Sequence, residues 1–179
     1  MKTKMLGKLL VFAGTTMCLG AAPGLADNPH CRQIGGGILT NFLDPSQCLR
    51  TVGSSVNLCT DGTATGDLRG AVGVQVLQVT GTATGLILHN QHHWVTESGD
   101  TIFLNPADAT AYATPDNNRF LTDYLNGIVI TGGTGAFAGA TGELTSVFGG
   151  VDLNLGQVTS GQVTLRYAGT VCFAHVPPP

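Results

Sequence analysis

Residues 68–77, Leu-Arg-Gly-Ala-Val-Gly-Val-Gln-Val-Leu, alternate in character with a period of two. The even positions hold leucine, glycine and three valines, whereas the odd positions include arginine and glutamine. Successive side chains of a β-strand point to opposite faces, so this alternation predicts a strand with one apolar face.

Further strand-like stretches follow at intervals bounded by turns. The expected strands are 86–97, 101–104 and 128–130, followed by hairpin-like segments at 136–148 and 151–173, the last ending in 162–173. Residues 105–118 are polar, contain two prolines and predict a loop, and residues 119–126 fit either a helical turn or the start of a strand. About eight strands without a long helix predict an all-β barrel or sandwich.

The first 26 residues have the pattern of a secretory signal peptide. Lys2, Lys4 and Lys8 precede a short apolar run, and the small residues Gly24 and Ala26 precede the expected cleavage site. The run is too short to span a bilayer comfortably, although a retained membrane anchor is the alternative. The pattern predicts a periplasmic or secreted protein that has no membrane association after cleavage.

Removal of residues 1–26 changes the charge of the chain. The remaining residues include five arginines, eleven acidic residues and no lysine, which gives a formal net charge of −6. This composition excludes Schiff-base chemistry on a lysine and argues against nucleic acid as a partner.

Four cysteines follow the predicted cleavage site, at positions 31, 48, 59 and 172. An even number in an exported chain predicts two disulfides, for which three pairings exist. We favour Cys31–Cys48 and Cys59–Cys172 among the three. No closely spaced cysteine pair of the kind found in zinc sites occurs.

The chain after residue 26 is long enough for one domain. Residues 27–54 contain two prolines and a glycine triplet, and predict an irregular lead-in that a disulfide staples. Residues 55–174 are the expected β-domain. Residues 175–179 end in three prolines, which cannot join a β-ladder, and are expected to form a tail.

A glycine-rich segment at 130–142 has the sequence Ile-Thr-Gly-Gly-Thr-Gly-Ala-Phe-Ala-Gly-Ala-Thr-Gly. It resembles a motif of the allene oxide cyclase and dirigent barrel proteins, Gly-Gly-Thr-Gly-x-Phe-x-x-Ala-x-Gly, which enters a late strand. Residues 66–70, Gly-Asp-Leu-Arg-Gly, lie upstream in the same order. We expect Gly132, Gly133 and Gly135 to adopt positive φ and Phe137 to be buried. A phosphate loop would need a lysine and a following helix, which this segment lacks.

The resemblance implies a single antiparallel eight-stranded barrel with an apolar cavity, assembled as a homodimer or homotrimer. Members of these families bind small hydrophobic or phenolic molecules and steer their cyclisation or coupling without a cofactor. The implied function is therefore an exported barrel that binds such a molecule and guides its isomerisation or cyclisation. A non-catalytic carrier or an extracellular scaffold is the alternative from a different class.

Residues 88–94, Leu-His-Asn-Gln-His-His-Trp, are the most unusual local stretch. On a strand His89, His93 and Glu97 share one face, whereas His92 and Trp94 share the other. His93 is a candidate general base. A metal site is the alternative, but His89 and His93 would lie about 13 Å apart on a strand, so further ligands would have to come from other strands.

The remaining candidate catalytic residues are Glu97, Glu143 and Arg166. An acid that points into an apolar lumen has a raised pKa and is suited to moving protons, and Arg166 could orient an anionic ligand. Each also fits the simpler role of a charge at the rim. The Gly-x-Ser-x-Gly motif of a nucleophilic hydrolase does not occur.

Overall fold

The computed structural model describes residues 30–48, 55–116, 118–153 and 160–174. The predicted signal peptide and C-terminal tail lie outside the described residues. Within them the strands are β1 (Cys31–Phe42), β2 (Leu58–Ala64), β3 (Gly70–Gly81), β4 (Gly85–Thr96), β5 (Thr101–Leu104), β6 (Ala107–Ala113), β7 (Arg119–Asp123), β8 (Ile128–Gly133), β9 (Thr141–Leu153) and β10 (Gly161–Cys172). Three short 3-10 turns are η1 (Pro45–Gln47), η2 (Gly66–Leu68) and η3 (Gly135–Phe137). No helix among these residues is long and apolar enough to cross a membrane.

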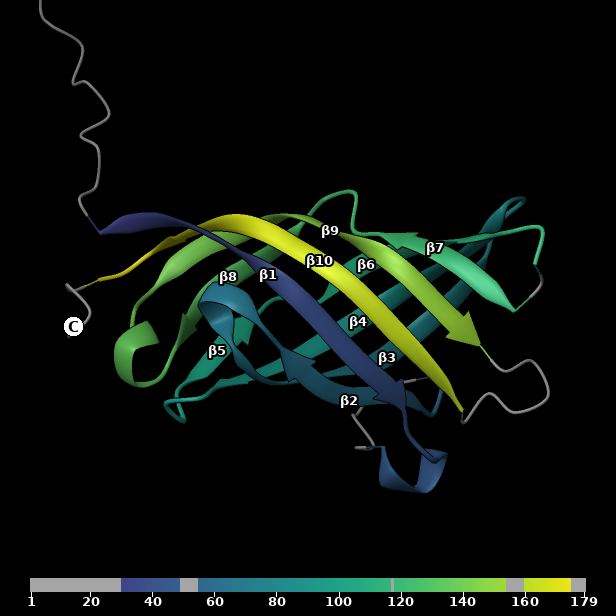
Figure 1. The fold of residues 1–179 in the computed structure, drawn as a ribbon, viewed down its shortest axis with the longest axis horizontal. Helices are drawn as coiled ribbons and strands as arrows, with labels where there is room; N and C mark the ends of the chain where they lie inside the picture. Colours follow the sequence, from purple (N-terminus) through teal and green to yellow (C-terminus); the bar gives the residue numbers. More distant parts are fainter. Residues whose placement is uncertain (1–29, 49–54, 117, 154–159, 175–179) are drawn as a thin grey trace, which may run out of the picture.

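The strands form one closed antiparallel barrel (Figure 1). β5 and β6 pair with different halves of β4, and β7 and β8 pair with different halves of β9. Each of these two pairs acts as one interrupted strand, so the barrel has eight positions around its wall, and the β9–β10 pairing completes the ring. The predicted eight-stranded antiparallel barrel is therefore confirmed.

Two segments that the sequence pattern did not assign to strands, the polar residues 105–118 and the ambiguous residues 119–126, contribute to the barrel wall. β6 occupies part of the predicted loop 105–118, and β7 shows that 119–126 begins as a strand. In β6 the inward residues Ala109 and Ala111 are buried, whereas Asp108 and Tyr112 are exposed. The alternation is present, but alanine is too weakly hydrophobic to make it conspicuous.

The predicted irregular lead-in is wrong for residues 31–42, which form β1 between β2 and β10. Its glycine triplet was interpreted as a break, but the glycines allow the chain at Thr65 to cross β1 closely. A Cβ atom on Gly36 would collide with the Thr65 carbonyl oxygen and with the ring of Tyr167. These glycines therefore permit close packing within a regular strand.

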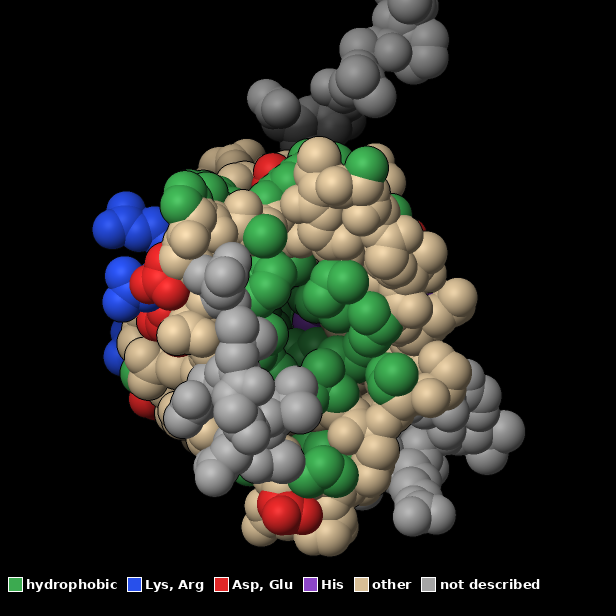
Figure 2. All heavy atoms as spheres, turned by 90° about the vertical axis from the view of Figure 1, so that its right-hand side faces the viewer, with side chains coloured by type: hydrophobic (Ala, Val, Ile, Leu, Met, Phe, Trp, Pro, Cys, Tyr) green, Lys and Arg blue, Asp and Glu red, His purple; other side chains and the backbone are tan. Residues whose placement is uncertain are grey.

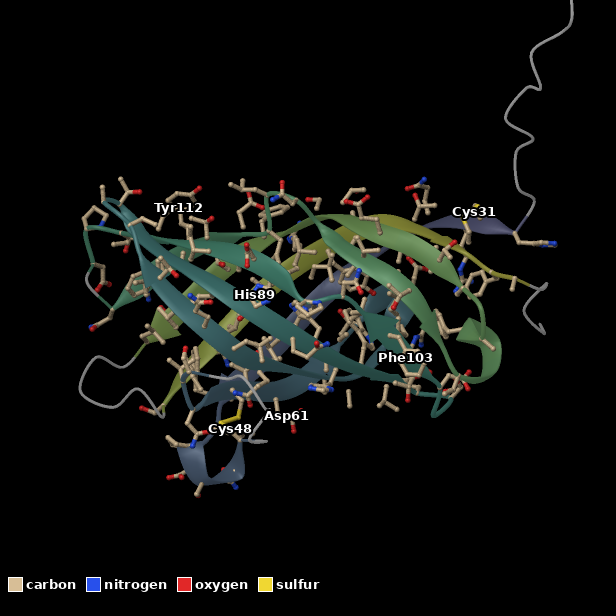
Figure 3. The ribbon with its side chains drawn as sticks, turned by 180° about the vertical axis from the view of Figure 1, so that it is seen from behind. Cys31, Cys48, Asp61, His89, Phe103 and Tyr112 are labelled. Atoms are coloured by element: carbon tan, nitrogen blue, oxygen red, sulfur yellow. A yellow bond between two sulfur atoms is a disulfide. The ribbon has the colours of Figure 1, made fainter. Side chains whose placement is uncertain are left out.

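Two disulfides join the four cysteines, as predicted, but the favoured pairing was wrong. The bonds are Cys31–Cys172 and Cys48–Cys59. Cys31 lies directly opposite Cys172 in the β1–β10 ladder, and a strand the length of β1 carries the chain about 40 Å away before it reaches Cys48. The second bond attaches the η1 turn to β2 on the outside of the wall (Figure 3).

The glycine-rich segment 130–142 forms the end of β8, the η3 turn and the start of β9. Phe137 is buried and packs against Phe173, with ring centroids 5.4 Å apart. Gly132 and Gly135 have positive φ as expected, but Gly133 does not. A Cβ atom on Gly133 would instead collide with the Thr101 carbonyl oxygen.

One half of the barrel is filled by a packed core. Leu68 of η2 and Trp94 of β4 are almost fully buried there, and the Trp94 indole N–H donates to the Leu68 carbonyl at 2.7 Å. The Tyr167 ring meets Trp94 edge-on at 5.3 Å. Its hydroxyl accepts from the Leu68 N–H and donates to the Thr65 carbonyl, each at 2.9 Å. η2 is thereby locked into this half and closes the lumen at that end.

A candidate ligand cavity in the barrel lumen

The other half of the lumen is an open cavity of about 290 Å³. Its wall is formed mainly by aliphatic and aromatic side chains, among them Val74, Leu88, Phe120 and Val163. Figure 2 looks into the mouth and shows a hollow ringed by apolar side chains, with a histidine at its bottom. His92 is the histidine that lines the cavity. Among the described lining residues none is Asp, Glu, Lys or Arg.

Residues of β4 line the cavity from its mouth to its floor. Leu86, Leu88, Asn90, His92 and Trp94 occupy the even positions and all line the lumen. This follows from the two-residue period of a strand, because the apolar residues at 86, 88 and 94 set the face that is buried. Asn90 and His92 are carried inward on the same face.

A polar cluster interrupts the apolar lining. The Asn90 Nδ2 atom donates to the Tyr124 hydroxyl at 3.0 Å, and His92 Nε2 lies 2.9 Å from the same oxygen. All three side chains are at most 7% exposed. Three buried atoms of the lining have no hydrogen-bond partner: Asn90 Oδ1, His92 Nδ1 and Thr60 Oγ1.

Burial controls the protonation of this cluster. It lowers the pKa of His92 to about 3, with a smaller contribution from the neighbouring His93, and it raises the pKa of Tyr124 far above its usual value. At neutral pH the imidazole is therefore uncharged and the phenol keeps its proton. Neither group has the pKa near 7 that suits general acid–base catalysis.

The four predicted catalytic residues lie outside the cavity lining, and the structure does not bring them together. His93 is exposed on the outer face of β4, and Arg166 is exposed on the outside of β10. Glu97 lies in the exposed turn after β4, where it meets Arg69 at 3.9 Å. Glu143 is half-buried on β9, opposite Thr170, four residues along β10 from Arg166. These placements give none of the four access to a ligand in the lumen.

Sequence reasoning missed Asn90, His92 and Tyr124 as a group. The periodicity of β4 held a usable signal, because the even positions 86–94 carry two leucines and a tryptophan. That bias identifies their face as the buried one and favours His92 over His93. Tyr124 lies just beyond the end of β7, where no periodicity predicts its direction.

The outer wall of the barrel carries His89 as well as His93. His89, labelled in Figure 3, has its Nδ1 atom 2.7 Å from Asp108 Oδ1 on the neighbouring β6. In the part of the chain that the structure describes, no group of three or more His, Cys, Asp or Glu side chains is arranged to hold a metal ion.

Comparisons with protein-family models, with curated proteins and with solved structures gave no match to this chain.

Proposed function

We propose that this chain is an exported barrel that binds one small hydrophobic or phenolic molecule in its lumen and guides the isomerisation or cyclisation of that molecule without a cofactor. The open, apolar half-lumen is the observation that carries the proposal. Eight-stranded barrels have room for one small ligand when side chains do not fill them. The two disulfides suit an oxidising compartment, either the periplasm or the medium.

The cavity favours binding through the burial of apolar surface. Each Å² of apolar ligand surface removed from water contributes about 25 cal/mol before the costs of association. Trp94, which lines the cavity, is held in place by its hydrogen bond to the Leu68 carbonyl and by its contact with the Tyr167 ring. A rigid pocket can hold a flexible molecule near one reactive conformer, which is the contribution that positioning makes to catalysis.

The electrostatics of the cavity favour a second candidate, a carrier that returns its ligand unchanged. His92 and Tyr124 hold their protonation states throughout the neutral range. The lining therefore offers positioning and hydrogen bonds, but no group that exchanges protons readily at neutral pH. A reaction in this cavity must therefore start as soon as the bound substrate adopts the reactive conformer. If the ligand does not react in that conformer, the barrel acts as a carrier.

Trp94 provides a direct test of lumen binding because it is the single tryptophan of the chain and lines the cavity. The uncharged fluorophore N-phenyl-1-naphthylamine should bind at one saturable site per chain and accept excitation energy from Trp94. Ala111→Phe places a ring inside the lumen and should weaken binding on the order of tenfold or more by filling the space. Ala111 is 4% exposed and lies on the lumen side of β6.

The matched control is Ala168→Phe, which adds the same ring to an exposed position on β10. It should bind the fluorophore as the unmodified protein does. Equal binding by the Ala111→Phe and Ala168→Phe proteins would refute the lumen as the site. Native mass spectrometry of protein from an exporting host then identifies any retained compound. Conversion of that compound to an isomer on incubation supports catalysis, whereas its unchanged recovery supports the carrier.

A further inference from the structure

Among the described residues, four buried side-chain polar atoms have no hydrogen-bond partner, and three of them belong to residues that line this cavity, the fourth being Gln75 Oε1. Asn90 Oδ1, His92 Nδ1 and Thr60 Oγ1 each lack a partner, although the residues that carry them are at most 7% exposed. Buried polar groups are satisfied in the great majority of native structures, because an unmet hydrogen bond is costly. Their concentration on one cavity lining indicates that a bound group satisfies them.

The residues around these atoms define the charge that such a group can carry. No arginine, lysine or acidic residue stands among the described residues of the lining. An ionised carboxylate or ammonium placed here would lose its hydration without gaining a counter-charge, which is strongly unfavourable. The group that enters must be uncharged.

We propose, building on the lumen-binding function above, that Asn90 and His92 form a subsite for an uncharged hydroxyl group, so that the ligand enters hydroxyl first and leaves its apolar part toward the mouth. The Asn90 amide already uses its Nδ2 atom as a donor to Tyr124, which leaves Oδ1 as an acceptor that needs an O–H or N–H group. A hydroxyl meets that need.

The tautomer of His92 decides whether one ligand hydroxyl can pair with both residues. If Nε2 carries the proton, Nδ1 is an acceptor, and if Nδ1 carries the proton, it is a donor. The Tyr124 hydroxyl accepts from Asn90 Nδ2, so its own hydrogen can go to His92 Nε2, which places the imidazole proton on Nδ1. A ligand hydroxyl can then donate to Asn90 Oδ1 and accept from His92 Nδ1–H, whereas with Nδ1 as an acceptor its single hydrogen would serve only one of the two atoms. An ether oxygen lacks the donor that Asn90 requires, and a carboxylate lacks it and carries a charge as well.

Three probes of similar size separate these requirements: 1-octanol, its isomer heptyl methyl ether, and octanoate. Their binding is measured at pH 8 by isothermal titration calorimetry and by the change in Trp94 fluorescence. The octanol should bind about tenfold more tightly than the ether, the effect of one hydrogen bond to an otherwise unpaired buried acceptor. The octanoate should bind more weakly than both.

Asn90→Leu replaces the amide by an apolar side chain of similar size and should bring the octanol-to-ether affinity ratio close to one. Asn41→Leu makes the same change at an exposed position of β1 and should keep the tenfold ratio. Near-ultraviolet circular dichroism verifies that both variants are folded. If Asn90→Leu proves unfolded, Asn90→Ala, which also removes Oδ1, replaces it and should reduce the ratio in the same direction.

Each remaining outcome has a defined meaning. Equal binding of octanol and ether by the unmodified protein, or an undiminished ratio in Asn90→Leu, overturns the hydroxyl subsite and leaves lumen binding intact. Octanoate that binds as tightly as octanol overturns the requirement for an uncharged group. If none of the three probes binds at its solubility limit, lumen binding itself is wrong, and the subsite with it.

Discussion

The Tyr167 hydroxyl holds the η2 turn (Gly66–Leu68) at the closed end of the lumen. Its removal gives the sharpest test of the fold. Tyr167→Phe deletes one oxygen that accepts from the Leu68 N–H and donates to the Thr65 carbonyl, both at 2.9 Å. The ring itself keeps its edge-on contact with Trp94. The variant therefore changes hydrogen bonding with little change in packing.

The expected magnitude follows from the two partners that remain. Leu68 is 1% exposed, so its N–H has no access to water and loses its only hydrogen bond, at a cost of about 1–3 kcal/mol. Thr65 is exposed, and its carbonyl can turn to solvent at little cost. We expect the free energy of unfolding to fall by about 2 kcal/mol, which for a domain of this size lowers Tm by roughly 4–8 °C.

Urea unfolding followed by circular dichroism measures this loss. Tyr112→Phe is the matched control because Tyr112 is 38% exposed on the outer wall, and its removal should change stability by less than about 0.5 kcal/mol. A Tyr167→Phe variant within 0.5 kcal/mol of the unmodified protein would refute the idea that this hydroxyl holds η2 in place. A loss of equal size in both variants would show that the effect is not specific to the contact between Tyr167 and η2.

Two further predictions concern the disulfides and His92. In the loop-closure model, replacing Cys31 and Cys172 by alanine removes a cross-link that spans 141 residues and costs about 5 kcal/mol, whereas replacing Cys48 and Cys59 removes one that spans 11 residues and costs about 3 kcal/mol. Urea unfolding of both double variants tests this order, and a larger loss from the shorter loop would contradict it. Because burial lowers the pKa of His92 to about 3 while the unfolded chain protonates near 6.5, stability should fall as pH drops between these values, by up to about 1.4 kcal/mol per pH unit. His92→Phe should flatten that part of a urea midpoint-against-pH profile, and an unchanged slope would show that another group is responsible.

The fold was largely predictable because strands with one apolar face show an alternation of apolar and polar residues in the sequence. β3 and β4 fulfil this rule, and their boundaries differ from the expected ones by a few residues. The rule fails where the inner face is made of small residues. β6 turns two alanines inward and β1 carries three consecutive glycines, so neither has the hydrophobic contrast on which a period-two pattern depends.

The disulfide pairing could not be derived from spacing because it depends on which strands are neighbours. If residues 31–42 are taken as an irregular lead-in, the position of Cys31 is undefined, and a disulfide that closes the short loop to Cys48 is the natural choice. Once β1 is a strand paired with β10, Cys31 and Cys172 face each other across the ladder. The error in the lead-in and the error in the pairing therefore have a single cause.

The candidate site shows a different limit of sequence-based prediction. Charged residues are scarce in this chain and therefore stand out as catalytic candidates, but an apolar cavity excludes charged side chains. Glu97, Glu143, His93 and Arg166 were chosen for their chemistry, yet the lumen is apolar and its lining holds no charged side chain among the described residues. Burying one of them unpaired would cost more than the barrel could readily compensate. The side chains left to act on a ligand are uncharged, so selectivity has to come from shape and from the unpaired atoms beside Tyr124. Any reaction in this lumen must then be one that correct folding of the substrate is sufficient to start, and substitution of the four outer residues should leave ligand affinity unchanged.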